Sequence, residues 1–263
     1  MTSLFLYRER QRTQQTPQVR GTGWWGTDKP HLRETAAGFS EKKLSSAPVA
    51  VVSDVDSTLI EEEVIDQLAE LAGVGAQVAE ITDSAMRGEL DFAQSLTQRV
   101  ALLKGLRVEA LEEVAQSLHV RPGAQKLIDW VHQHGGVFTV VSGGFTPVVA
   151  SLARSLGIDQ YKANDFEIHD GILTGRVAGD IVTAQTKEQF LTSIRGDLGA
   201  PVIALGDGAN DIPMLRAADL GIAILAKPAV KQAIGSYLDW DHLDAVIGLA
   251  GFSDNSATGD PQH

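Results

Sequence analysis

The sequence predicts an α/β fold, a doubly wound parallel sheet with a small helical cap inserted after the first strand. Short apolar runs at 50–52, 137–141 and 202–205 each end in a polar cluster, which is typical of buried parallel strands. Helical patterns separate these runs, as in sheets built from strand–helix–strand units. The stretch from about 75 to 118 has no strand pattern and breaks near its glycines, so we expect the helical cap there.

The other elements follow from local signals. Apolar residues recur on one face of a helix expected over 61–73, and Pro122-Gly123 opens another helix that runs to about 135. Asp170-Gly171 predicts a hairpin between strands at 166–168 and 172–177. The remaining expectations are helices at 146–156, 187–194 and 241–249 and a short strand at 221–224.

These patterns divide the chain into four parts. The expected limits are a flexible N-terminal arm at 1–45, an α/β core at 46–68 and 120–250, a helical cap at 69–119 and a C-terminal tail at 251–263. The arm is rich in Arg, Gln, Thr, Gly and Ser and sustains neither a helix nor a strand period. Its strongest apolar feature is Trp24-Trp25, whose role the sequence leaves open.

Composition excludes several classes of function. The 263 residues carry a formal net charge of -12, and such an acidic surface repels a nucleic-acid backbone. The absence of cysteine excludes disulfides, thiolate metal sites and cysteine nucleophiles. We find neither an apolar run long enough to cross a bilayer nor a secretory signal, so we expect a cytoplasmic protein without a membrane partner. The oligomeric state, monomer or homodimer, stays open.

The polar clusters at the strand ends are the candidate site. Open parallel sheets bind ligands outside the carboxyl ends of their strands. The clusters are Asp54-Val55-Asp56-Ser57-Thr58, Ser142-Gly143-Gly144 and Gly206-Asp207-Gly208-Ala209-Asn210-Asp211. Together they bring several carboxylates to one edge, and carboxylate oxygens are ligands that Mg²⁺ prefers. The sequence therefore predicts a Mg²⁺ site at this edge.

A phosphoryl group fits the same edge. A carboxylate can attack phosphorus and carry the phosphoryl group as an aspartyl phosphate. Lys187 would offset the acidic field and stabilise charge in the transition state. The Ser142 hydroxyl and the N–H of Gly143, near a helix start, suit a phosphate oxygen. Each part alone is a weak signal, but their order along the chain favours one site for phosphate and magnesium.

At these residues the sequence resembles the haloacid-dehalogenase (HAD)-like superfamily and, within it, the phosphoserine phosphatases. The segments that match the four motifs of the superfamily, in order, are 54–59, 140–145, Lys187 and 206–211. The stretch from Ala85 to Arg99 is similar to the phosphoserine phosphatase cap. The resemblance covers about residues 48–250 and implies a HAD-like Rossmannoid core.

The resemblance implies catalytic and metal-binding roles. Asp54 would be the nucleophile, and Asp56 would protonate the leaving serine oxygen and then activate the attacking water. Lys187 would complete the catalytic set. The expected ligands of Mg²⁺ are Asp54, the backbone carbonyl of Asp56 and the side chain of Asp207.

The resemblance also implies the substrate, O-phospho-L-serine, which would be hydrolysed to L-serine and phosphate in the last step of serine biosynthesis. Glu63 would hold the ammonium of this substrate and Arg99 its carboxylate. Met86 and Phe92 would shield the site from water. The other substrate-binding candidates are Ser142, Gly143 and Asn210.

Rival functions stay open to different degrees. The same residues could transfer the phosphoryl group to another alcohol, such as homoserine, or act on another small phosphomonoester. A non-catalytic Mg²⁺- or phosphate-binding module is disfavoured, because Asp54, Asp56, Lys187 and Asp207 are all present. A dinucleotide-binding fold is excluded, because no G-x-G-x-x-G follows the first strand. Many bacterial members carry a ligand-sensing domain of the ACT type before the core, and the arm is too short and too polar to form one.

Overall fold

The structure, a computed structural model, describes residues 6–8 and 49–250 of the chain. These residues form an eight-stranded sheet of order β1-β8-β7-β6-β2-β3-β4-β5. The strands are β1 (Leu6–Arg8), β2 (Ala50–Ser53), β3 (Val137–Phe145), β4 (Gln160–His169), β5 (Ile172–Ala178), β6 (Val202–Gly206), β7 (Leu220–Ile224) and β8 (Ser236–Leu238). Neighbours from β8 to β4 are parallel, and the edge pairs β4–β5 and β1–β8 are antiparallel. The predicted α/β fold is confirmed.

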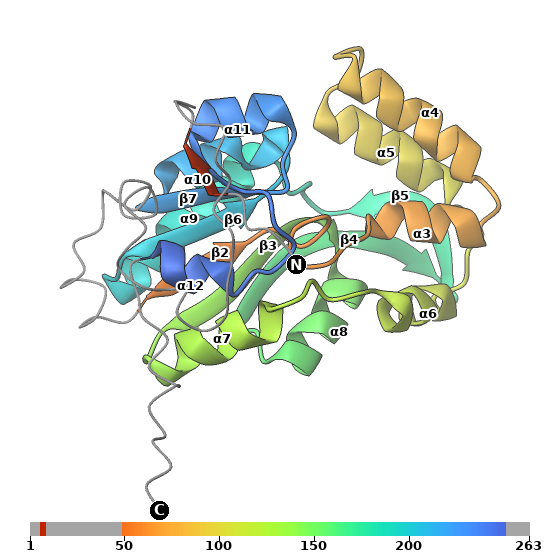
Figure 1. Cartoon of the computed structure of the whole chain (residues 1–263). Coiled ribbons are helices and arrows are strands. Elements are labelled where there is room, and N and C mark those ends of the chain that lie inside the picture. The colour runs from red at the N-terminus through yellow and green to blue at the C-terminus, as the bar shows by residue number, and fades with distance from the viewer. Residues whose placement is uncertain (1–5, 9–48, 251–263) are drawn as a thin grey trace, which may run out of the picture.

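Helices cover both faces of the sheet (Figure 1). They are α3 (Val64–Leu71), α4 (Gly75–Met86), α5 (Phe92–Leu102), α6 (Glu109–Ser117), α7 (Ala124–Gln133), α8 (Thr146–Leu156), α9 (Ala184–Leu198), α10 (Ile212–Ala217), α11 (Pro228–Ile234) and α12 (Ala245–Leu249), with a 3-10 turn at Ala209–Asp211. In β2, Val51 packs in a core with residues of α7 and α8, and Val52 packs in a second core with residues of α9. Both faces of this strand are therefore buried, which explains its continuous apolar sequence.

The segment between β2 and β3 forms the helices α3 to α6, and Figure 1 shows α4 and α5 standing away from the sheet. α5 begins with a capping box, in which Asp91 and Gln94 each accept a hydrogen bond from the backbone N–H of the other. The N–H of Gly105 donates to the carbonyl of Leu173 at 2.9 Å, which joins the insertion to β5. The predicted helical insertion is confirmed, and its limits of 69–119 stay a prediction.

Several elements differ from the sequence prediction. β3 continues through Ser142-Gly143-Gly144 to Phe145, with an irregular register against β4, so the strand is longer than the predicted 137–141. The sequence pattern predicts neither α11 nor β8, because seven and three residues are too few to establish a period. The last helix covers 245–249 rather than 241–249.

The terminal predictions fall largely outside the described residues. Residues 6–8 pair with β8 as an edge strand, although the sequence predicts no strand in the arm. The rest of the arm, with Trp24-Trp25, and the tail at 251–263 lie outside the described residues. Among the helices that the structure describes, none has the length and apolar character that a membrane span requires.

Candidate active site

Three segments from distant parts of the chain meet at the carboxyl edge of the central strands. Because β2 lies between β3 and β6, the residues that follow these strands are neighbours. The N–H of Asp54 donates to the carbonyl of Leu205 at 2.9 Å, which anchors Asp54 beside β6. Carboxylate oxygens of Asp54, Asp207 and Asp211 all lie within 4.8 Å of one another. The structure therefore places three acidic side chains around one point.

Lys187 extends from α9 into this acidic cluster and is fully buried. Its Nζ lies 2.8 Å from Oδ1 of Asp54 and 2.7 Å from Oδ1 of Asp211. Burial by itself would lower the pKa of Lys187, but the charges of Asp211 and Asp54 outweigh it and raise that pKa above its usual value. The ammonium therefore stays protonated and fixes the orientation of both carboxylates.

Asp54, Asp207 and Asp211 offer the oxygen ligands that a hard divalent cation prefers. Burial raises the pKa of Asp207 to about 6, and the charge of Asp211 adds to this rise. Burial and Asp211 also raise the pKa of Asp54, against the lowering effect of Lys187. Because one ammonium cannot neutralise three carboxylates, a divalent cation would supply the missing charge. Asp211 thus joins the predicted ligands Asp54 and Asp207, whereas the carboxylate of Asp56 is not in this cluster.

Both carboxylate oxygens of Asp56 are held by hydrogen bonds. Oδ1 accepts from the N–H of Val64 at 2.8 Å, and Oδ2 accepts from the hydroxyl of Ser142 at 2.9 Å. Burial raises the pKa of Asp56, although these two hydrogen bonds lower it. A Cβ on Gly144 would lie 2.6 Å from Oδ2, so glycine leaves the room that this carboxylate needs. A fixed carboxyl group with a raised pKa is suited to general acid–base chemistry.

Ser142 and Gly143 lie at the end of β3, next to Asp56. The Ser142 hydroxyl is fully buried and contacts Asp56, so Ser142 lies behind the wall of the site. The carbonyl of Gly143 accepts a hydrogen bond from the Asn164 side chain at 2.8 Å. No sequence pattern indicates a role for Asn164, a buried residue of β4. A Cβ on Gly143 would lie 2.8 Å from the ring of Phe92, so the glycine allows α5 to approach the sheet.

A cavity of about 350 Å³ lies between the sheet edge and the inserted helices. From the strand ends it is lined by Asp54, Asp56, Gly143, Gly144, Asp207 and Asn210, and from the insertion by Glu63, Asp66, Met86, Phe92, Leu96 and Arg99. The structure therefore brings most of the predicted site residues to one cavity. Ser142 and Lys187 are the exceptions, since both are buried behind its wall.

Glu63 and Arg99 contribute opposite charges to the cavity. Glu63 accepts a hydrogen bond from the Ser57 hydroxyl at 2.8 Å, and burial together with the charge of Asp56 raises its pKa to about 7. Burial lowers the pKa of Arg99. The Nε of Arg99 donates to the Ser95 carbonyl at 3.4 Å, and among the described residues its two Nη groups make no hydrogen bond. These groups are therefore available to a carboxylate, which a guanidinium binds with two parallel hydrogen bonds.

Arg121 supports the site from outside the cavity, a role that the sequence does not reveal. Its buried guanidinium donates to the carbonyl of Thr58 at 2.8 Å and to that of Ser57 at 2.9 Å. The two bonds hold a turn in which Ser57 has a left-handed backbone, with φ of 55°. From the same turn, the Thr58 hydroxyl donates to Asp207 at 3.2 Å. Arg121 thus fixes the loop that follows Asp56.

Comparisons with known proteins agree with this geometry. A family model of haloacid dehalogenase-like hydrolases matches residues 51–216, and a second model with the same description matches 186–247. Phosphoserine phosphatase of Streptococcus thermophilus is 50% identical over 191 residues, which cover 72% of this chain and 89% of the relative. Phosphoserine phosphatase SerB2 of Mycobacterium tuberculosis is 48% identical over 204 residues, 76% of this chain, and the chain spans 50% of that longer relative. A solved phospho-aspartyl intermediate analogue of phosphoserine phosphatase is similar with a TM-score of 0.71 and 38% identity, over 75% of this chain and 96% of that one.

Proposed function

The chain belongs to the phosphoserine phosphatase family of the haloacid dehalogenase-like hydrolases, and we propose that it hydrolyses O-phospho-L-serine through a phosphoaspartate on Asp54. The observation that carries this proposal is the position of Asp54, which lines the cavity while Lys187 holds its carboxylate from behind. Glu63 and Arg99 line the same cavity with the charges that a zwitterionic amino acid requires.

In the first step, a carboxylate oxygen of Asp54 forms a bond to phosphorus, and the bond between phosphorus and the serine oxygen breaks. Lys187 and the N–H of Val55, each 2.8 Å from Oδ1, fix the carboxylate in one orientation. The leaving serine oxygen takes a proton from Asp56, whose raised pKa favours the protonated form that this step needs. The step yields L-serine and the phosphoaspartate.

In the second step, Asp56 takes a proton from a water molecule as the water oxygen attacks phosphorus. The bond between phosphorus and Asp54 breaks, which releases inorganic phosphate and restores the free carboxylate. Asp56 thus acts first as an acid and then as a base, and the bonds from Val64 and Ser142 hold it in place for both steps.

Asp54, Asp207 and Asp211 would hold the metal of the proposed reaction, for which we propose Mg²⁺ because all three donors are carboxylate oxygens. The backbone carbonyl of Asp56, predicted from the resemblance, is proposed as a further ligand. When bound, the cation would neutralise the repulsion between the carboxylates and the incoming phosphoryl group. Lys187 keeps the cluster partly neutral.

The proposed substrate pose follows from the charges of the walls. Glu63 holds the serine ammonium, and the Nη groups of Arg99 hold the serine carboxylate. Phe92 contacts Gly143 where the inserted helices meet the strand ends, so it would limit the entry of water. Asn210 lines the cavity and is proposed to contact the phosphoryl group. By this substrate, the enzyme would act at the last step of serine biosynthesis, for which we propose a cytoplasmic location.

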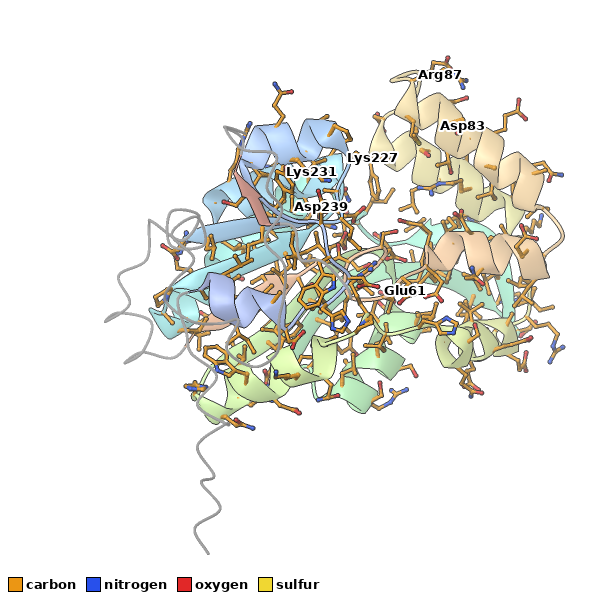
Figure 2. All side chains as sticks on the ribbon, in the orientation of Figure 1. Glu61, Asp83, Arg87, Lys227, Lys231 and Asp239 are labelled. Carbon is orange, nitrogen blue, oxygen red and sulfur yellow. The ribbon has the colours of Figure 1, made fainter. Side chains whose placement is uncertain are left out.

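The decisive experiment measures phosphate release from L-phosphoserine with and without Mg²⁺, beside phosphothreonine and a sugar phosphate. We expect Mg²⁺-dependent release that is greatest with L-phosphoserine and is lost in Asp54→Asn. Asp83→Asn, the same substitution at an exposed position of α4, should behave like the wild type (Figure 2). Release from the sugar phosphate but not from L-phosphoserine would refute the roles of Glu63 and Arg99. Undiminished release by Asp54→Asn would refute the nucleophile.

A further inference from the structure

The solvent-facing end of the cavity carries a cation that the proposed mechanism does not use. Lys227 lies between β7 and α11 and lines the cavity together with Met86. Its Nζ lies 3.5 Å from the Sδ of Met86, the last residue of α4. Both side chains are exposed, so their contact spans the opening between the sheet side and the inserted helices. Figure 2 shows Lys227 on the sheet side of this opening. A substrate that enters here passes the ammonium of Lys227.

The charge of Lys227 lies apart from the carboxylates that the structure describes at 49–250. Among the described residues it makes no ion pair, and its contact with Met86 is to a thioether, which is a weak acceptor. Lys231, one turn further along α11, is paired with Asp239. The ammonium of Lys227, unlike that of Lys231, is therefore available to an external anion.

Most of the charged residues in the walls behind Lys227 are acidic. Asp54, Asp56, Glu63, Asp66 and Asp207 line the cavity, and among the lining residues that the structure describes the only cations are Arg99 and Lys227. A phosphomonoester dianion that approaches a chain of net charge -12 is repelled before it reaches Lys187. An exposed ammonium at the opening reduces this repulsion where the anion first arrives.

We propose that Lys227 captures the phosphoryl group of the incoming substrate at the opening of the cavity and thereby raises the rate of productive association. The proposal rests on the proposed function in that the substrate is a phosphomonoester. It makes Lys227 a substrate-binding residue that acts on kcat/KM through its charge. The charge of a flexible, exposed side chain acts through solvent, so its effect depends on ionic strength.

The test compares kcat/KM for L-phosphoserine in the wild type, Lys227→Gln, Lys227→Arg and Lys231→Gln. Lys231→Gln removes the same charge four residues further along the chain, from α11, at a residue that does not line the cavity. At an ionic strength near 0.01 M, where charges act over roughly 30 Å, Lys227→Gln should lower kcat/KM by about tenfold. Near 1 M salt, where charges act over roughly 3 Å, the difference in kcat/KM between the wild type and Lys227→Gln should fall below about twofold. Lys227→Arg should keep most of the rate, and Lys231→Gln should stay close to the wild type.

Binding of inorganic phosphate, measured by calorimetry with Mg²⁺ at low salt, separates this inference from the proposed function because it needs no turnover. Phosphate should bind several-fold more weakly to Lys227→Gln than to Lys231→Gln. If the wild type failed to hydrolyse L-phosphoserine while this difference in binding persisted, the proposed function alone would fail. If the wild type were active and Lys227→Gln matched it in both measurements, the inference alone would fail. A loss of kcat/KM that is independent of salt would also overturn it, because it would assign Lys227 a packing role against Met86.

Discussion

Replacing Lys187 with methionine should strongly destabilise the folded chain, because it removes a positive charge from inside the acidic cluster. Methionine is an apolar side chain of similar length, so the change in packing is small. Lys187 is fully buried, with its Nζ 2.8 Å from Asp54 and 2.7 Å from Asp211. Loss of one partner from a buried ion pair leaves an uncompensated charge and costs about 3–5 kcal/mol. Since domains unfold with roughly 5–15 kcal/mol, this loss is a large part of the total.

The stability that Lys187→Met loses should be greater at high pH than at low pH. Burial and Asp211 raise the pKa of Asp54, and Lys187 opposes this rise, so the pKa climbs further in the variant. An acid whose pKa is raised by folding binds its proton more tightly in the folded state. The penalty therefore applies fully above the folded-state pKa and fades as the pH falls through it. Lys187→Met should accordingly be most unstable at alkaline pH and recover part of its stability in mild acid.

Urea unfolding in EDTA, at about pH 8 and about pH 5, measures both effects without a contribution from bound metal. Adding Asp211→Asn to Lys187→Met removes a stranded charge and should restore at least about 1 kcal/mol at the higher pH. Lys162→Met, at an exposed position of β4, should stay within about 0.5 kcal/mol of the wild type. The reasoning fails if Lys187→Met costs less than about 1 kcal/mol at the higher pH, or if Asp211→Asn destabilises it further.

Three other predictions concern activity and metal binding. Gly143→Ala would place a Cβ 2.8 Å from the ring of Phe92, so kcat/KM should fall about tenfold or more as α5 is displaced. The double variant Gly143→Ala with Phe92→Leu should recover part of the lost kcat/KM. A double variant as slow as Gly143→Ala would contradict the clash. Glu63, with a pKa of about 7, must be ionised to hold the substrate's ammonium, so kcat/KM should decline as the pH falls below that value. The same limb of the pH profile should be absent in Glu63→Gln, and its persistence there would assign it to another group. Mg²⁺ at a hundred times its Kd should raise the free energy of unfolding of the wild type by about 2.7 kcal/mol, which is measured as a rise in Tm. An equal rise in Tm for Asp207→Asn would exclude Asp207 as a ligand.

The parts of the fold that the sequence predicts are those whose burial imposes a pattern. Both faces of β2 and β6 are covered by helices, so every residue in them is buried and the strands read as apolar runs. The sequence does not predict α11 and β8, because each is too short for a helix or strand period to be recognised. Paired glycines are common in turns, but Gly143 and Gly144 lie in β3. A side chain would clash at either position, because a Cβ at Gly143 would meet Phe92 and a Cβ at Gly144 would meet Asp56.

The residues of the candidate site likewise divide into those that a sequence pattern indicates and those that no pattern indicates. Asp54, Asp56 and Asp207 can be found in the sequence because each follows a buried strand, where a parallel sheet collects its ligands. Asn164 and Arg121 cannot be found in this way. Arg121 acts on a turn 63 residues earlier in the chain, and Asn164 supports the Gly143 carbonyl from the neighbouring strand. Their partners are set by the packing of distant segments, for which one sequence carries no local pattern.

Lys187, Arg99 and Lys227 differ in burial, and burial decides what each can do. Lys187 has no exposure and two carboxylates in contact, so its charge is fixed in place and can orient Asp54 but cannot follow a substrate. Arg99 is partly buried and keeps its Nη groups free of hydrogen bonds to the described residues, which suits a ligand that binds and leaves. Lys227 is exposed at the opening, where a charge acts at long range at low salt and is screened at high salt. A substrate with two anionic groups would thus meet the mobile ammonium of Lys227 first and the fixed ammonium of Lys187 last.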